Sequence, residues 1–213
     1  MRGSRSTASG RPRGLAPRDI AAIERHLSRR EARREQLYER ARALRRRAQH
    51  RMIELQTATG PVRPDPELAD ALRGLAGYLR SPAAVEAALA RDALQEGTEA
   101  LLLEAIVRGD PIPGPARLGV DPEEYLLGLG DVIGEIRRLA LTALAKGDWD
   151  RADAQLALME RLYLDLMRFD TTRAIVQLKP KQDTARALLE RTRGDVVLAR
   201  VFSRATPPAG RGR

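Results

Sequence analysis

Residues 124–138, EYLLGLGDVIGEIRR, decide the fold because they combine a leucine-rich helical pattern with three glycines and an acid pair. At 100° per residue, the apolar side chains fall on one side of a helix and predict a stripe that faces a core. This stripe consists of Leu126, Leu129, Val132, Ile133, Ile136, Leu139 and Ala140. Such a stripe is typical of a helix that packs on other helices.

The flanking residues predict where this helix begins and ends. Asp121 can cap the first turn, Pro122 suits the first helical position, and Gly147 suits the position after the last turn. The glycines at 128 and 130 therefore lie inside a helix. A dinucleotide-binding loop would need a preceding strand, so these glycines do not indicate such a site.

The composition extends the helical prediction to the whole chain. The 213 residues are 43% hydrophobic but only 3% aromatic. Abundant alanine, leucine, arginine and glutamate favour helices, whereas strands favour β-branched and aromatic residues. We expect an all-α, single-domain antiparallel bundle of about six to seven helices. Proline and glycine clusters separate the helices, and the first of them should run from near Pro17 to Thr57.

The ends of the chain differ from its centre. Residues 1–15 and 203–213 are rich in small and basic residues, glycine and proline. They can bury too little apolar surface to offset the entropy lost on ordering, so they are predicted to be disordered tails. The helical domain should occupy residues 16–202.

Charge and cysteine content narrow the class of protein. The formal net charge of +9 favours a polyanionic partner such as nucleic acid. With no cysteine there can be no disulfide and no thiolate metal site. The sequence shows neither a membrane-spanning run nor a signal peptide, so we expect a cytoplasmic protein without a membrane partner.

Asp131 and Glu135 lie on the polar side of the central helix, beside Gly128 and Gly134. The two acids are four residues apart, so their like charges repel each other. Each glycine inside a helix costs about 1 kcal/mol relative to alanine. The missing side chains suggest that a second backbone or a phosphate approaches here.

A second acidic group interrupts an apolar helical stripe within residues 83–108. Glu96 and Glu99 are three residues apart and share one face with Asp92. Carboxylates on a buried stripe need a partner charge or a metal ion. The complete stripe consists of Val85, Leu89, Asp92, Glu96, Glu99, Leu103 and Ile106.

The two acid pairs, Glu96 with Glu99 and Asp131 with Glu135, could together form an oxygen-rich metal site. Oxygen ligands suit Mg²⁺, with Mn²⁺ as the other possible ion, and such a metal can activate water for phosphodiester hydrolysis. The alternative is that these acids pair with arginines or face solvent, because acid pairs are common at helical spacing.

The first helix is strongly basic, since residues 25–47 contain ten arginines and three acids. Arginine binds phosphate through its planar guanidinium, which favours contact with a nucleic-acid backbone. The predicted nucleic-acid-binding residues are Arg30, Arg33, Arg34, Arg45, Arg46, Arg47 and, from the central helix, Arg138. Equally, the helix could be solvated and joined by ion pairs along its own surface. Its predicted packing edge is Ile23, Leu27, Leu37, Leu44, Met52 and Leu55.

The stretch from Glu123 to Met167 resembles the translin family, and the branch of translin-associated factor X more than translin itself. The family motif of tyrosine, two leucines and glycine is matched at residues 125–128, followed by Asp131, Glu135 and the Gly147-Asp148 turn. Upstream, LQEGTEA at residues 94–100 resembles the family's leucine-glutamine-glutamate motif. The likeness covers most of residues 18–198.

This resemblance implies a fold, an assembly and an activity. It implies a bundle of about seven helices, a closed and roughly octameric shell, and Mg²⁺-dependent endoribonuclease activity on RNA inside it. The catalytic and metal-binding residues it implies are Glu96, Glu99, Asp131 and Glu135. The chain lacks the long loop that the eukaryotic catalytic subunit has before the tyrosine-leucine-leucine motif. It therefore resembles a prokaryotic, archaeal-type member that acts as a homo-oligomer.

Two other functions compete with the nuclease. One is a non-catalytic translin-like shell that binds RNA or single-stranded DNA, in which the acids are structural. The other is a helical scaffold with solvated charges, which would show no salt-sensitive binding of nucleic acid. Phosphate-led recognition leaves single-stranded, duplex and tRNA-derived RNA all open as partners.

Overall fold

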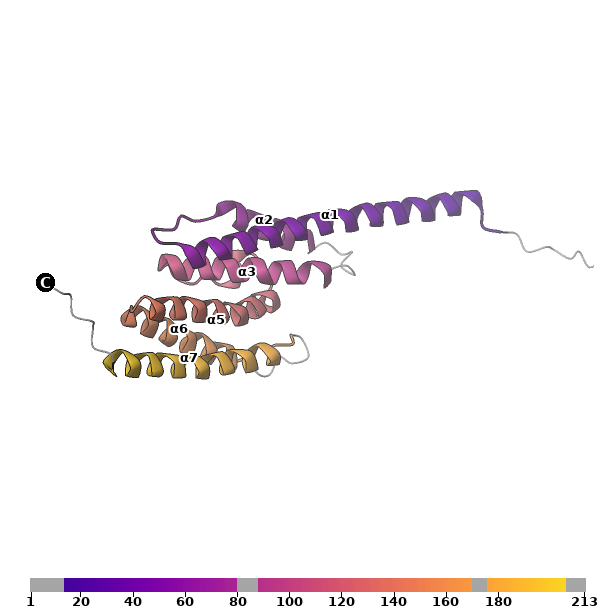
Figure 1. Cartoon of the computed structure of the whole chain (residues 1–213). Helices are drawn as coiled ribbons and strands as arrows, with labels where there is room; N and C mark the ends of the chain where they lie inside the picture. Colours follow the sequence, from indigo (N-terminus) through magenta and orange to yellow (C-terminus); the bar gives the residue numbers. More distant parts are fainter. Residues whose placement is uncertain (1–13, 80–87, 170–175, 206–213) are drawn as a thin grey trace, which may run out of the picture. The chain divides into compact units, whose positions relative to one another are not determined.

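The computed structural model describes residues 14–79, 88–169 and 176–205. In these ranges the chain forms seven helices and no strand, which confirms the all-α prediction (Figure 1). They are α1 (Pro17–Thr57), α2 (Pro66–Leu79), α3 (Ala88–Arg108), α4 (Pro115–Leu118), α5 (Pro122–Ala145), α6 (Trp149–Met167) and α7 (Lys179–Ala205). Most of the predicted tails, together with Val85 of the predicted acidic stripe, lie outside the described residues.

The chain divides into two compact units, residues 1–36 and 37–213. The described part of the first unit consists mainly of the N-terminal half of α1. There Ile23 and Leu27 are 48% and 56% exposed, so the predicted packing edge is wrong for these two residues. The reason is that residues 14–36 contain no second helix on which they could pack.

The helical bundle is the second unit, and it begins at Leu37. The predicted packing edge of α1 is correct here, because Leu37, Leu44 and Leu55 are buried. At the other end, α7 continues to Ala205, beyond the domain boundary expected at residue 202. The described part of the bundle therefore extends from Leu37 to the end of α7.

Helix α5 lies at the centre of the bundle. It packs against α3 on one side and against α6 and α7 on the other (Figure 1). All seven residues of the predicted core stripe, from Leu126 to Ala140, are buried. Burial of large aliphatic side chains contributes about 1.5–3 kcal/mol for each residue, so this stripe is a major source of stability.

Contacts between side chains show the direction of each helix. Arg45 pairs with Glu96 and Arg51 pairs with Glu104, so α1 and α3 run in the same direction. Helices α3 and α5 also run in parallel, because Gly128 near the start of α5 lies beside Gln95 of α3, whereas Leu139 further along α5 lines the same cavity as Val107 near the end of α3.

Helix α7 runs parallel to α5 and antiparallel to α6. Asp131 and Arg137 of α5 pair in order with Lys181 and Asp195 of α7. In contrast, the later residue Glu160 of α6 pairs with Arg193, whereas the earlier Asp153 pairs with Arg200. The expected antiparallel packing therefore applies to the consecutive helices α6 and α7, whereas the alternate helices α1, α3, α5 and α7 run in one direction.

The glycines of α5 allow neighbouring helices to approach closely. A Cβ atom on Gly128 would lie 2.9 Å from the carbonyl oxygen of Gln95 in α3. A Cβ atom on Gly130 would lie 2.8 Å from the Cβ atom of Lys181 in α7. The sequence predicts a second backbone or a phosphate close to Gly128, and its neighbour in the structure is the backbone of α3. The other expected neighbour, a phosphate, has no room beside Gly128.

The ends of α5 follow the predicted signals with one correction. Pro122 occupies the first turn, but the side chain of Asp121 makes no capping hydrogen bond. At the other end, Gly147 has φ of +73°, a conformation that favours glycine. The amide of Asp148 donates to the carbonyl of Ala143 over 2.9 Å and so closes the last turn in a Schellman motif.

Candidate functional site

Parallel packing of α3 on α5 brings the four predicted acids, Glu96, Glu99, Asp131 and Glu135, into one neighbourhood. All four are half-buried. Burial, followed by the negative charges of Asp131 and Glu135, raises the pKa of Glu99 to about 8, with Glu96 adding a smaller contribution. The charge of Lys181 opposes this rise. We call these four acids the acid cluster.

Asp131 is held by two side chains. The Nζ atom of Lys181 lies 2.5 Å from its Oδ1 atom, and the amide of Gln95 donates to its Oδ2 atom. The stem of Lys181 passes along Gly130, where a larger residue would displace it. The sequence reasoning did not place Lys181 or Gln95 beside Asp131, and only the glycine at position 130 hinted at a close neighbour.

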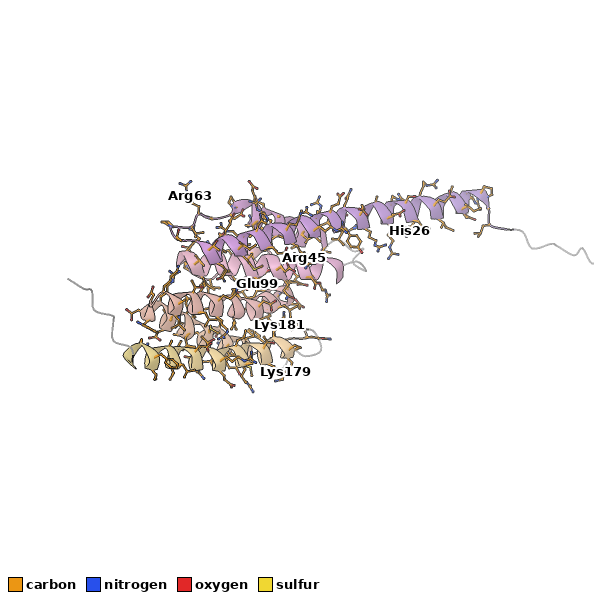
Figure 2. All side chains as sticks on the ribbon, viewed as in Figure 1. His26, Arg45, Arg63, Glu99, Lys179 and Lys181 are labelled. Atoms are coloured by element: carbon orange, nitrogen blue, oxygen red, sulfur yellow. The ribbon has the colours of Figure 1, made fainter. Side chains whose placement is uncertain are left out.

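Glu96 of the acid cluster contacts two side chains of α1. A guanidinium nitrogen of Arg45 lies 2.8 Å from its Oε1 atom, and the amide of Gln49 donates to its Oε2 atom over 3.3 Å. Figure 2 labels Arg45, Glu99 and Lys181, which come from α1, α3 and α7. Side chains of α1 and α7 therefore lie beside the acid cluster, whose own members come from α3 and α5.

Glu135 also receives a side chain from α1. The amide of Gln56 donates to the Oε2 atom of Glu135 over 2.8 Å and to its main-chain carbonyl over 3.1 Å. Arg138 lies one turn further along α5 and donates to Glu135 over 3.2 Å. Asp92, which the sequence placed on the same stripe as Glu96 and Glu99, is exposed.

The donor chemistry of the acid cluster fits Mg²⁺, since carboxylate oxygens are the ligands that this ion prefers. The charges of the other three acids act on Glu99, which shows that the carboxylates are close to one another. As they are arranged, however, no three histidine, cysteine, aspartate or glutamate side chains in the described ranges converge on one point. Lys181, Arg45 and Arg138 draw Asp131, Glu96 and Glu135 toward themselves.

A model of the Translin family matches residues 72–193, which is more than half of the chain. The chain belongs to the Translin family. The match includes both acid pairs of the acid cluster and none of the arginines predicted in α1 to bind nucleic acid. No helix in the described part of the chain has the length and apolar character needed to cross a membrane.

A curated relative of the chain is the uncharacterized protein MJ0175 of Methanocaldococcus jannaschii. It is 38% identical over 122 residues, which are 57% of this chain and 50% of the relative. The chain thus aligns with about half the length of this relative.

Three solved structures share the translin-type fold. Apo-NeC3PO has a TM-score of 0.76 at 22% identity and covers 87% of this chain and 99% of its own. AfC3PO in complex with duplex RNA has a TM-score of 0.72 at 28% identity, covering 86% and 97%. AfC3PO alone has a TM-score of 0.71 at 29% identity, covering 86% and 98%. These matches confirm the fold predicted from the resemblance to the Translin family.

The arginines predicted to bind nucleic acid have different surroundings. Arg47 is bound to Asp65 and Glu67, with its Nε atom 3.0 Å from a carboxylate oxygen of Asp65, and thereby ties α1 to the start of α2. Arg45 and Arg138 are paired within the acid cluster, and Arg46 is exposed. The other three, Arg30, Arg33 and Arg34, lie in the first unit.

Proposed function

We propose that this chain is an Mg²⁺-dependent endoribonuclease of the Translin family that binds RNA and acts as a homo-oligomer. The observation that carries this proposal is the convergence of two helices that each bear an acid pair, so that the pKa of Glu99 responds to the charges of Asp131, Glu135 and Glu96. A partly buried carboxyl group whose pKa is raised by neighbouring carboxylates is typical of catalytic sites.

RNA as the substrate is supported by charge and by structural likeness. The net charge of +9 attracts a polyanion. The neighbour AfC3PO, at a TM-score of 0.72, is a complex with duplex RNA. Phosphate contacts depend little on base identity, so we expect single-stranded as well as duplex RNA to bind. Binding of single-stranded DNA can be measured in the same way.

The chemistry follows from residues of this chain. Glu96, Glu99, Asp131 and Glu135 would hold the ion, which, when bound, supplies an activated water and neutralises charge on the phosphate. In the metal-free acid cluster the pKa of Glu99 is about 8, so this acid would release its proton when it binds the ion near neutral pH. Arg138 is exposed beside Glu135 and is a candidate for orienting a phosphate of the strand.

A homo-oligomer is supported by an exposed apolar row near the end of α7. Val197, Leu198, Val201 and Phe202 are 60%, 56%, 57% and 66% exposed. Their spacing places them on one face of the helix. Contiguous exposed apolar surface of this kind typically marks an interface. An octameric shell remains part of the proposal, and its test is the molar mass measured by light scattering.

A non-catalytic RNA-binding protein is the second candidate. It is favoured by the pairing of Glu96, Asp131 and Glu135 with Arg45, Lys181 and Arg138, which gives the acids a structural role without a metal.

The deciding experiment measures cleavage of a labelled short RNA by wild type, Glu96→Ala and Asp131→Ala, each with Mg²⁺ and with EDTA. The nuclease predicts that wild type alone cuts and only with Mg²⁺, while both variants still bind RNA. Binding without cutting by every protein would establish the non-catalytic candidate. A folded variant that loses binding would contradict the assigned roles of these acids.

A further inference from the structure

A cavity of about 360 Å³ lies at the junction of α1, α3, α5 and α6, in the second unit. Its floor is apolar and includes the buried residues Leu55, Leu139 and Ala143. Its rim is polar and consists of Gln56, Thr59, Thr142, Lys146, Asp148 and Arg151. Sites for small molecules typically combine such a floor with a few polar groups and have volumes of about 300–1,000 Å³.

Two cations on the rim, Lys146 and Arg151, are available to a ligand. Neither forms an ion pair with an acid in the described parts of the chain, and both are exposed. The rim also contains the acid Asp148. Its carboxylate caps α6 by accepting a hydrogen bond from the main-chain amide of Arg151 over 3.1 Å. The basic residues around the acid cluster are not available in the same way, because Arg45, Arg138 and Lys181 are each paired with a carboxylate.

One side chain joins the cavity to the acid cluster. Gln56 lines the cavity, and its amide donates to the Oε2 atom of Glu135 over 2.8 Å. Gln56 therefore contacts both the cavity and one member of the acid cluster. A chain of nucleotides bound at one of them would pass directly beside the other.

We propose that this cavity, which we call the α5–α6 pocket, binds one nucleotide unit of RNA next to the acid cluster. Its phosphate lies between Lys146 and Arg151, and its ribose or base packs on the apolar floor of Leu55, Leu139 and Ala143. Thr142 and Gln56 offer hydrogen bonds to the sugar or base. This inference rests on the proposed RNA-binding function and deepens it, because it assigns a subsite for the strand.

The positive end of α6 adds to this preference for an anion. Helix α6 begins at Trp149, and two residues at its start, Asp148 and Arg151, line the cavity. The start of a helix favours negative charge. The observation is secondary, and the proposal depends on the two unpaired cations and the adjacent acid cluster.

The test measures the affinity of the full chain for fluorescein-labelled single-stranded and duplex RNA in EDTA, by anisotropy over a range of salt concentrations. Lys146→Met combined with Arg151→Met should weaken binding by about tenfold or more at moderate salt, and should lower the slope of log affinity against log salt by about 1.4 for a single strand. Arg161→Met with Arg191→Met is the matched control. It removes the same charge from exposed arginines outside the pocket.

A second variant separates filling of the pocket from loss of charge. Thr142→Phe adds bulk to the rim without changing charge, and it should weaken RNA binding while leaving the salt slope unchanged. Circular dichroism melts establish that each variant is folded. If the Lys146/Arg151 variant weakens binding no more than the Arg161/Arg191 control does, the pocket is not an RNA subsite.

The same measurements distinguish failure of the proposed function from failure of the pocket alone. Wild type that binds no RNA would overturn the proposed function itself, whereas wild type that binds RNA equally well after the pocket substitutions would overturn only the pocket. Calorimetry with adenosine 5′-monophosphate and with inorganic phosphate tests a free ligand. Tight binding of either by wild type, with no effect of the substitutions on RNA, would assign the pocket to a free phosphate compound and contradict the proposal.

Discussion

The ammonium group of Lys181 lies 2.5 Å from the Oδ1 atom of Asp131, and this contact joins α7 to α5 at the acid cluster. Both side chains are about one quarter exposed. The contact is therefore screened less by solvent than an ion pair on the surface.

The first prediction concerns this pair. Lys181→Met should lower the free energy of unfolding by about 1–3 kcal/mol, because it leaves the partly buried charge of Asp131 without its cation. Asp131→Asn combined with Lys181→Met should cost less than the sum of the two single changes. Urea denaturation of all four proteins measures this coupling. Strict additivity would show that the contact contributes nothing to stability.

The second prediction concerns pH. The pKa of Glu99 is raised in the fold from its ordinary value of 4.5 to about 8, so the folded state binds the proton more tightly than the unfolded state does. Stability without metal should therefore be greatest below about pH 4.5 and fall as the pH rises toward 8, by roughly a few kcal/mol. This refers to the contribution of Glu99 alone.

Glu99→Gln isolates that contribution. The variant should lose most of the decline in stability between pH 5.5 and pH 8.5, and it should be more stable than wild type at pH 8.5. Urea titrations in EDTA across this range provide the measurement. An equal decline in both proteins would assign the pH dependence to other groups.

The third prediction compares two glycines of α5. Gly128→Ala should destabilise the fold by about 1–3 kcal/mol, because the new Cβ atom would lie 2.9 Å from the main-chain oxygen of Gln95. Gly134→Ala is the control, since its Cβ atom would meet only a methyl group of Leu188 at 3.6 Å. It should stabilise by about 0.5–1 kcal/mol through helix propensity. Thermal melts that rank the two variants in the opposite order would refute the close packing of α3 on α5.

The fourth prediction concerns the metal. Adding Mn²⁺ or Mg²⁺ should raise the melting temperature of wild type, because an ion bound only by the folded state stabilises it by about 2.7 kcal/mol at one hundred times its dissociation constant. EDTA should reverse the shift, and Asp131→Asn should abolish it. Asp92→Asn is the matched control, since Asp92 is exposed on α3. Equal shifts in wild type and Asp131→Asn would place the bound ion elsewhere.

The fifth prediction concerns assembly. Val201→Asp with Phe202→Asp should lower the molar mass measured by light scattering, because two charges would enter a buried apolar interface. Glu190→Gln with Arg191→Gln is the control on the same helix. An unchanged mass in the aspartate variant would exclude this part of α7 from the interface.

The core of α5 could be predicted from the sequence because a long apolar stripe at helical spacing has few alternative explanations. Each residue of the predicted stripe, from Leu126 to Ala140, is buried in the structure. The same reasoning failed at Ile23 and Leu27, which show an apolar spacing but have no second helix in their own unit. Periodicity identifies a face that can pack, whereas burial also requires a partner.

The acids could be selected from the sequence, but their surroundings could not. Glu96 and Glu99 lie on α3, whereas Lys181 arrives from α7, 50 residues beyond Asp131. Such contacts depend on tertiary packing and leave no local pattern. The short helix α4 could not be predicted either, because its four residues lie within a stretch rich in proline and glycine, which is typical of a loop.

The pairing of the acid cluster with basic residues of the same chain affects whether the chain can fold before it binds the proposed metal ion. Arg45, Lys181 and Arg138 neutralise three of the carboxylates, and the pKa of Glu99 near 8 keeps the fourth largely protonated at neutral pH. A newly made chain can therefore bury these acids before it meets any ion. Metal-dependent zinc fingers stay unfolded until they are loaded. This chain instead supplies its own counter-ions, so in the proposed metal-dependent enzyme the ion would bind after folding and could be removed without loss of the fold.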